Sequence, residues 1–237
     1  MQLLLGSGGY RTPERVSLLA AAMRAFFGDV GRLLFVPYAL ADHDGYVKSM
    51  TERGLHGGYE LDGIHHHPDP VRAVAEAKGI FMGGGNTFRL LNELYRFGLL
   101  DVIRDRVRHG LPYLGISAGT NVACPAIKTT NDMPIVQPPS FDALGLVPFQ
   151  VNPHYFSGQT FVKREDSFHE HYGETRDDRL RESHEMNDLP VVGLWEGGLL
   201  HVEAGTVVLQ GAAARIFRKG QPPVDVEAGS RLDKLMA

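Results

Sequence analysis

The sequence predicts a single α/β domain over residues 1–237, in which a mostly parallel central sheet is flanked by helices. Three observations lead to this prediction. Short apolar runs alternate with segments of helical periodicity through the first half of the chain, which is the rhythm of βαβ units. Several apolar runs lead directly into glycines or helix-capping residues. The length of 237 residues suits one hydrophobic core better than two.

The first three predicted strands are separated by two helices. The first strand spans residues 3–5, and Thr12 with Pro13 then begins a helix whose apolar residues recur on one face. The elements that follow are a buried strand at residues 33–36, a helix within residues 44–53 and a weaker strand over residues 59–64.

The next part of the chain brings two strand ends to one edge of the sheet. Right-handed crossovers place the carboxyl ends of parallel strands along one edge, where open sheets build their sites. Gly84 and Ser117 both follow strands and should lie on that edge. The predicted elements here are a helix from Asp69 and Pro70, a strand at residues 80–82, a helix through residues 90–94, a helix near residues 102–107, a strand at residues 113–116 and a short helix stopped by Pro125.

The last third of the chain has a different pattern, with additional short strands. A long loop spans residues 126–148, and a polar segment spans residues 157–173. The expected elements are a strand near Gln150, a helix capped by Thr175 and short strands at residues 191–195, 199–202, 207–209 and 215–217.

Composition excludes several classes of protein. A net charge of −4 and a pI near 6.2 provide no electrostatic basis for binding nucleic acid. No apolar stretch approaches the roughly 20 residues that span a bilayer, so no membrane association is expected. The first residues resemble a buried strand rather than a secretory signal. The lone Cys124 fits a reducing cytoplasm, and we expect a cytoplasmic protein.

Ser117 is the candidate nucleophile. The segment Gly115-Ile116-Ser117-Ala118-Gly119 matches G-x-S-x-G between a predicted strand and a predicted helix. The glycines leave room for a strained turn that exposes the hydroxyl, and the new helix directs its amides at the site. An ordinary tight turn is the alternative reading of these five residues. Their position between strand and helix favours a serine hydrolase.

An oxyanion hole needs at least two preorganised donors. The amide of Ala118 is one candidate, because it directly follows the nucleophile. Gly84 and Gly85, in a Gly-Gly-Gly-Asn run at the end of a neighbouring strand, are the others. A phosphate cradle is the competing interpretation, but the run lacks the usual glycine spacing and the lysine of such loops.

One of the 11 histidines should act as the base for the serine. His154 follows a predicted strand in Asn152-Pro153-His154, where a rigid turn would hold its ring. A structural histidine is the alternative. The run from His65 to His67 resembles a metal cluster, but consecutive side chains should diverge and no further ligands stand at recognisable spacing. We therefore expect a polar loop and no metal.

A carboxylate should orient the imidazole and stabilise its charged form. Asp132 and Glu196 both lie in loops that could supply it. Either could instead cap a helix or a turn, which is the more common role of an isolated loop carboxylate. The residues alone leave this choice open.

Taken together, these segments resemble a known family, the aspartyl dipeptidases called peptidase E. The fold of that family is similar to the fold of class I glutamine amidotransferases. The resemblance covers nearly the whole chain. Its most specific stretches are GGGNTFRLL at residues 83–91, GISAGTNVACP at residues 115–125, TTNDMPIV at residues 129–136, FDALGLVPFQVNPH at residues 141–154 and GETRDDR at residues 173–179.

The resemblance implies a hydrolase of dipeptides with an N-terminal aspartate that needs no cofactor. We expect a monomer or a homodimer. Carried over by position, it makes Ser117 the nucleophile and His154 the base. It favours Asp132 as the triad acid and leaves Glu196 as the alternative. By the same resemblance Arg176 binds the side-chain carboxylate of the substrate's aspartate through two parallel hydrogen bonds, and Asn86 also contacts the substrate.

The chain departs from the family pattern over residues 155–172, which are richer in charged and aromatic residues than those of the enteric enzymes. We interpret this segment as a mobile lid, which leaves the substrate range open. The alternatives are a cyanophycinase-like enzyme acting on β-linked aspartyl-arginine, another serine amidase or esterase, and a non-catalytic protein that binds its ligand at the glycine run.

Overall fold

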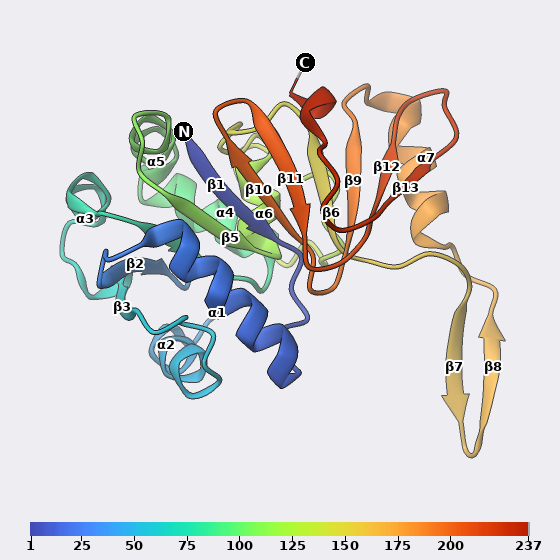
Figure 1. The fold of residues 1–237 in the computed structure, drawn as a ribbon, viewed down its shortest axis with the longest axis horizontal. Coiled ribbons are helices and arrows are strands. Elements are labelled where there is room, and N and C mark those ends of the chain that lie inside the picture. Colours follow the sequence, from blue (N-terminus) through green and yellow to red (C-terminus); the bar gives the residue numbers. More distant parts are fainter. Residues whose placement is uncertain (237) are drawn as a thin grey trace.

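The computed structural model describes residues 1–236 and contains a seven-stranded sheet as its largest element. Its strand order is β11-β10-β1-β5-β4-β2-β3, and Figure 1 shows this sheet with helices on both faces. The five parallel strands are β1 (Gln2–Gly6), β5 (Tyr113–Ile116), β4 (Ile80–Met82), β2 (Arg32–Val36) and β3 (Glu60–Gly63). The predicted α/β fold with a mostly parallel central sheet is confirmed.

Two apolar clusters show why the strands are buried on both faces. Along β1, Leu4 packs with one cluster while Leu3 and Leu5 pack with the other, as the two-residue period of a strand requires. The helices α1 (Pro13–Phe27) and α2 (His43–Glu52) cover the face of Leu4. The opposite face packs against α3 (Pro70–Glu76), α4 (Thr87–Arg96), α5 (Leu99–Arg108) and α6 (Ala118–Ala123).

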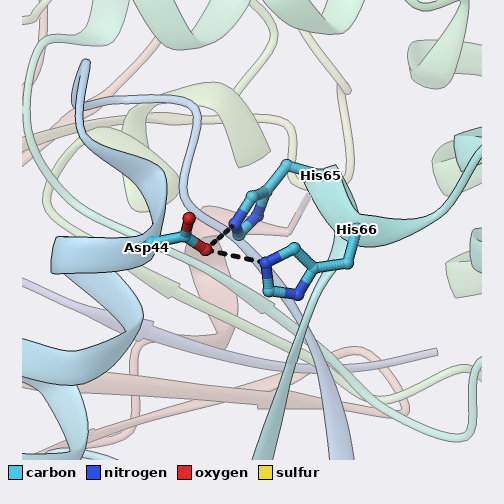
Figure 2. Close-up of side chains that lie close together, drawn as sticks. All are labelled: Asp44, His65 and His66. Atoms are coloured by element: carbon cyan, nitrogen blue, oxygen red, sulfur yellow. Dashed lines mark hydrogen bonds and ion pairs between the residues drawn. The ribbon is translucent and has the colours of Figure 1, made fainter.

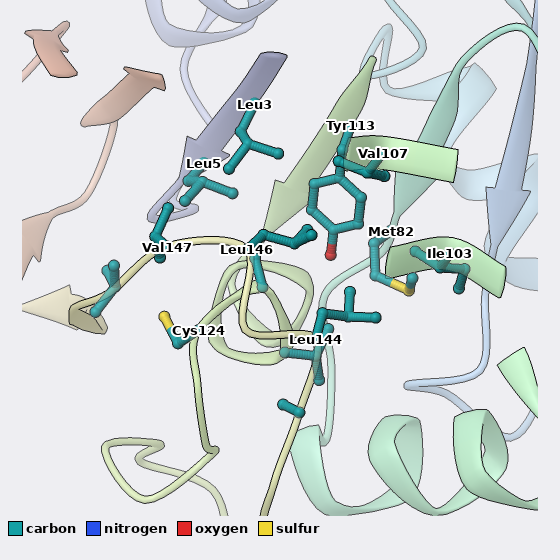
Figure 3. Packing of buried hydrophobic residues seen from close by; sticks show 14 of the residues in the cluster. Leu3, Leu5, Met82, Ile103, Val107, Tyr113, Cys124, Leu144, Leu146 and Val147 are labelled. Atoms are coloured by element: carbon teal, nitrogen blue, oxygen red, sulfur yellow. The ribbon is translucent and has the colours of Figure 1, made fainter. Parts of the chain in front are cut away.

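The long predicted loop fills part of the core on this second face. Between α6 and β6 (Gln150–Tyr155) the described chain has no helix or named strand, and its backbone is held to α6 by hydrogen bonds such as Leu144 N to Val122 O at 2.9 Å. Figure 3 shows Leu144, Leu146 and Val147 packed near Cys124 and Tyr113. This loop therefore contributes buried side chains, although it has no periodic pattern.

The last third of the chain adds antiparallel strands and a second sheet. The strands β10 (Leu199–Glu203) and β11 (Thr206–Gln210) extend the large sheet beside β1. The smaller sheet has the order β13-β12-β9-β6, in which β6 and β9 are parallel. Its remaining strands are β9 (Val191–Trp195), β12 (Ala214–Phe217) and β13 (Val224–Val226). Short 3₁₀ turns are η1 (Ile64–His66) and η2 (Asp233–Leu235).

The polar segment after β6 forms a hairpin that the sequence did not predict. Its strands β7 (Thr160–Arg164) and β8 (Ser167–His171) pair only with each other and are almost wholly exposed. Figure 1 shows this hairpin extending away from the rest of the molecule, before α7 (Arg176–Met186). None of its residues lines the cavity beside Ser117, and its interpretation as a lid stays a prediction.

Within residues 1–236 no helix combines the length and the apolar character that crossing a bilayer requires.

Candidate active site

Ser117 occupies the sharp turn between β5 and α6. Its backbone has φ 54° and ψ −109°, a left-handed conformation that costs a non-glycine residue about 1–3 kcal/mol. The turn is held by the Ser117 amide, which donates to Gly6 O at 2.9 Å. Glycine is required at position 119, since a Cβ there would lie 2.2 Å from Met82 O. The G-x-S-x-G segment thus forms the strained turn that the sequence predicts.

His154 faces the serine hydroxyl. Its Nε2 lies 3.0 Å from Ser117 Oγ, which is a hydrogen-bond distance. The residue has φ 54° and lies where the pairing of β6 with β9 shifts register. The ring therefore projects from an irregular strand end. This position makes His154 able to accept the proton of Ser117.

Ser7 holds the backbone of His154, and sequence reasoning missed it. Its buried hydroxyl accepts a hydrogen bond from the His154 amide at 2.8 Å and donates to Leu194 O at 2.8 Å. Directly beside it, Gly8 lies so close to the imidazole that a Cβ would be 2.5 Å from the ring. The signal in the sequence is the Gly-Ser-Gly-Gly run at the end of the first strand, on the same sheet edge as Ser117.

Glu196, rather than Asp132, contacts the imidazole. Glu196 Oε1 lies 3.1 Å from His154 Nδ1, and its other oxygen lies 3.4 Å from Arg15. The hydrogen bond from His154, supported by the charge of Arg15, lowers the pKa of the Glu196 carboxyl below its ordinary value. Glu196 therefore stays ionised at neutral pH and is placed to stabilise an imidazolium.

Asp132 caps the helix α4 instead. Its Oδ2 accepts hydrogen bonds from the Thr87 amide at 2.8 Å, from the Thr87 hydroxyl at 2.6 Å and from the Thr130 hydroxyl at 3.1 Å. A carboxylate at a helix N-terminus is stabilised by the unpaired amides and the helix dipole. The geometry thus does not support the preference for Asp132 as the partner of His154, because Glu196 makes that contact and Asp132 Oδ2 is bound by Thr87 and Thr130.

Two of the three predicted oxyanion donors, Gly84 and Gly85, line the cavity that opens onto the nucleophile. Gly84, Gly85 and Ser117 share this cavity of about 370 Å³ with His154 and Glu196. Within residues 1–236 neither the Gly85 amide nor the Ala118 amide has an acceptor. Unused amides beside a nucleophile can stabilise a developing oxyanion. Tyr46 also lines this cavity, and burial raises its pKa to about 12, so its phenol stays neutral.

Asn86 has a structural role that the prediction of substrate contact did not include. Its Oδ1 accepts from the Arg89 amide at 3.0 Å as the N-cap of α4, and its Nδ2 donates to Met133 O at 2.8 Å. Both polar ends of the side chain are therefore occupied. Asn86 orders the glycine loop that precedes it and does not line the cavity beside Ser117.

Arg176 begins α7 and lacks an acidic partner within residues 1–236. Its guanidinium lies over the ring of Phe156 with 5.5 Å to the centroid, and its buried Nε has no hydrogen-bond acceptor. Burial lowers the pKa of Arg176 from its ordinary value. A capping box between Thr175 and Asp178 fixes this end of the helix. Arg176 is not among the residues that line the cavity at Ser117.

His65 and His66 converge, contrary to the expectation that consecutive histidines diverge. Both rings contact Asp44, as Figure 2 shows. Both side chains project from η1, the short 3₁₀ turn that follows β3, and reach the same carboxylate. His67 contacts Asp62 instead, at 3.0 Å.

Comparisons with known proteins show which family this chain resembles. The model of peptidase family S51 matches residues 2–210. A peptidase E of Streptomyces coelicolor is 52% identical over 206 residues, which cover 86% of this chain and 82% of that protein. A probable alpha-aspartyl dipeptidase of Drosophila melanogaster is 48% identical over 192 residues, covering 80% and 77%. The crystal structure of a putative peptidase E protein from Listeria monocytogenes has a TM-score of 0.63 at 19% identity, covering 96% and 98%, and thus shares the fold.

Proposed function

Because this chain belongs to peptidase family S51, we propose that it is a serine dipeptidase that hydrolyses dipeptides with an N-terminal aspartate. The single observation that carries the proposal is the hydrogen-bonded series from Ser117 through His154 to Glu196, with distances of 3.0 and 3.1 Å. The names of the relatives, peptidase E and probable alpha-aspartyl dipeptidase, support the substrate class. We expect the enzyme to act in the cytoplasm.

The proposed reaction begins when His154 Nε2 takes the proton of Ser117 as Oγ attacks the peptide carbonyl carbon. Negative charge then develops on the carbonyl oxygen, where the amides of Gly85 and Ala118 stabilise it. The imidazolium, stabilised by Glu196, gives its proton to the leaving amine. Water, activated by the same imidazole, releases the aspartate and restores the Ser117 hydroxyl.

Substrate comparison tests the proposed specificity. Asp-Leu and Asn-Leu have nearly the same shape and differ in one charge, so their kcat/KM ratio measures recognition of the carboxylate. We expect Asp-Leu to be preferred by about tenfold or more, because a charge-assisted contact contributes about 1.5–3 kcal/mol. Leu-Leu serves as the apolar control. Equal hydrolysis of all three dipeptides would instead identify a general amidase.

Arg176 is the proposed partner of the substrate's aspartate carboxylate, because its guanidinium has no acidic partner in the described chain. Arg176→Ala should raise KM for Asp-Leu by about 10- to 100-fold, with a smaller effect on kcat. The matched control is Arg179→Ala on the same helix, where Arg179 pairs with Glu174 at 3.4 Å. If Arg53→Ala raises KM and Arg176→Ala does not, the substrate carboxylate is bound by Arg53, which lines the cavity.

A further inference from the structure

A second cluster of chemically active side chains lies at the β3 end of the large sheet. Asp44 stands in the first turn of α2, while His65 and His66 belong to η1. The Nε2 atoms of the two rings lie 2.9 and 2.7 Å from the same oxygen, Asp44 Oδ1. Figure 2 shows both rings directed at this carboxylate. Two segments separated by β3 therefore bring three donor atoms together.

The packing around His65 holds this arrangement in place. Its side chain is only 13% exposed, and its ring contacts His66 with 4.0 Å between centroids and His43 with 5.2 Å. Its Nδ1 is buried and has no partner within residues 1–236. The one polar contact of the ring is consequently the one that Nε2 makes with Asp44. Asp44 and His66 remain largely exposed, so an ion from solvent has access to the cluster.

The donor set matches a transition-metal ion. One ligand atom from each of Asp44, His65 and His66 lies within 4.8 Å of the others. Ligand bonds of about 2.0–2.2 Å in a tetrahedron separate neighbouring ligand atoms by about 3.3 Å. Each imidazole nitrogen would therefore move about 0.5 Å away from Asp44 Oδ1 to admit an ion. Imidazole with carboxylate suits zinc, whereas magnesium and calcium prefer all-oxygen sites.

We propose that Asp44, His65 and His66 bind a divalent transition-metal ion, with Zn²⁺ preferred over Mg²⁺ and Ca²⁺. Three protein ligands leave a fourth tetrahedral position for water. The site is separate from the catalytic serine, because β4 and β2 lie between β5 and β3 in the sheet. The bound ion would link the first turn of α2 to η1 through its protein ligands. Since α2 also carries Tyr46 in the wall of the catalytic cavity, the ion would stabilise that wall.

Metal titration of the full chain tests the site without relying on enzyme activity. Purified protein is titrated with Zn²⁺ by calorimetry and with Co²⁺ by visible absorption, where a tetrahedral site produces intense bands. The variants are Asp44→Asn and His66→Gln, and the matched control is His67→Gln, which removes a neighbouring histidine that contacts Asp62. We expect one high-affinity ion per chain, weakened by about tenfold or more in both variants and unchanged in the control.

Thermal unfolding provides a second readout for the same proteins. A ligand that binds only the folded state raises the unfolding temperature, so Zn²⁺ should raise it in the wild type and in His67→Gln, and less in the other two variants. Unfolding without metal checks that each variant folds. Failure of the wild type to bind Zn²⁺ would overturn the proposal and leave a hydrogen-bonded cluster. Equal affinity in Asp44→Asn, His66→Gln and the wild type would also overturn it.

Discussion

Ser117→Ala should lower kcat for Asp-Leu by about 10⁴-fold or more, which is the scale of effect for removing a serine nucleophile. The hydroxyl of Ser117 lies 3.0 Å from His154 Nε2 and is the group that attacks in the proposed reaction. Alanine removes Oγ while leaving the backbone bond to Gly6 in place. The expected result is therefore a loss of chemistry with little loss of folding.

Three measurements on Ser117→Ala separate chemistry from binding and folding. Initial rates with Asp-Leu give kcat, and thermal unfolding shows whether the strained turn still forms. A serine-reactive phosphonate should label the wild type on Ser117 and leave the variant unlabelled. Undiminished hydrolysis by a folded variant would remove Ser117 from the mechanism.

Glu196→Gln should have the second largest effect, a fall in kcat of about 100-fold or more. A glutamine keeps the size of the side chain but provides no negative charge to stabilise the imidazolium. The amide nitrogen of the glutamine can also donate a hydrogen bond to His154 Nδ1. The imidazole then carries its proton on Nε2, the atom that must be unprotonated to accept the proton of Ser117. Because the Glu196 side chain is 48% exposed, water also stabilises the imidazolium. Steady-state rates across pH 6–9 measure the effect.

The nucleophile was predictable from sequence because its signal is local. Ser117, its flanking glycines and the strand and helix around them are contiguous, and the structure forms the turn as expected. The residues offered His154 as a candidate base, with a structural histidine as the alternative, and the resemblance to peptidase E, which is confirmed, assigned it that role. The contact between Ser117 and His154 joins the end of β5 in the large sheet to β6 in the smaller sheet, and the βαβ pattern already placed Ser117 on the correct edge.

The carboxylate that contacts His154 was not predictable, since this contact depends on pairing between distant strands. Glu196 reaches His154 because β6 and β9 run parallel with Tyr155 opposite Trp195. Both strands are short, and nothing in their residues specifies this register. Asp132 looked equally suitable because a loop carboxylate has the same chemistry wherever it lies. Only the positions of Thr87 and Thr130 show that its oxygen is occupied.

The other differences between the predicted and the observed structure also arise in segments whose sequences have no periodic pattern. The hairpin of β7 and β8 buries no face, so its residues do not alternate between apolar and polar. The convergence of His65 and His66 depends on η1, a single 3₁₀ turn too short for a helical pattern. Asn86 and its N-cap bond, by contrast, follow a known sequence preference for helix starts and could have been predicted.

The most direct test of the account compares Glu196→Gln with Asp132→Asn under identical conditions. Both variants exchange a carboxylate for an amide of the same shape. If Glu196 completes the triad, its variant loses at least about 100-fold in kcat, whereas Asp132→Asn loses less than about tenfold and mainly unfolds at a lower temperature. A large loss of kcat in Asp132→Asn, with Glu196→Gln close to the wild type, would contradict the assignment of Glu196 as the acid behind His154.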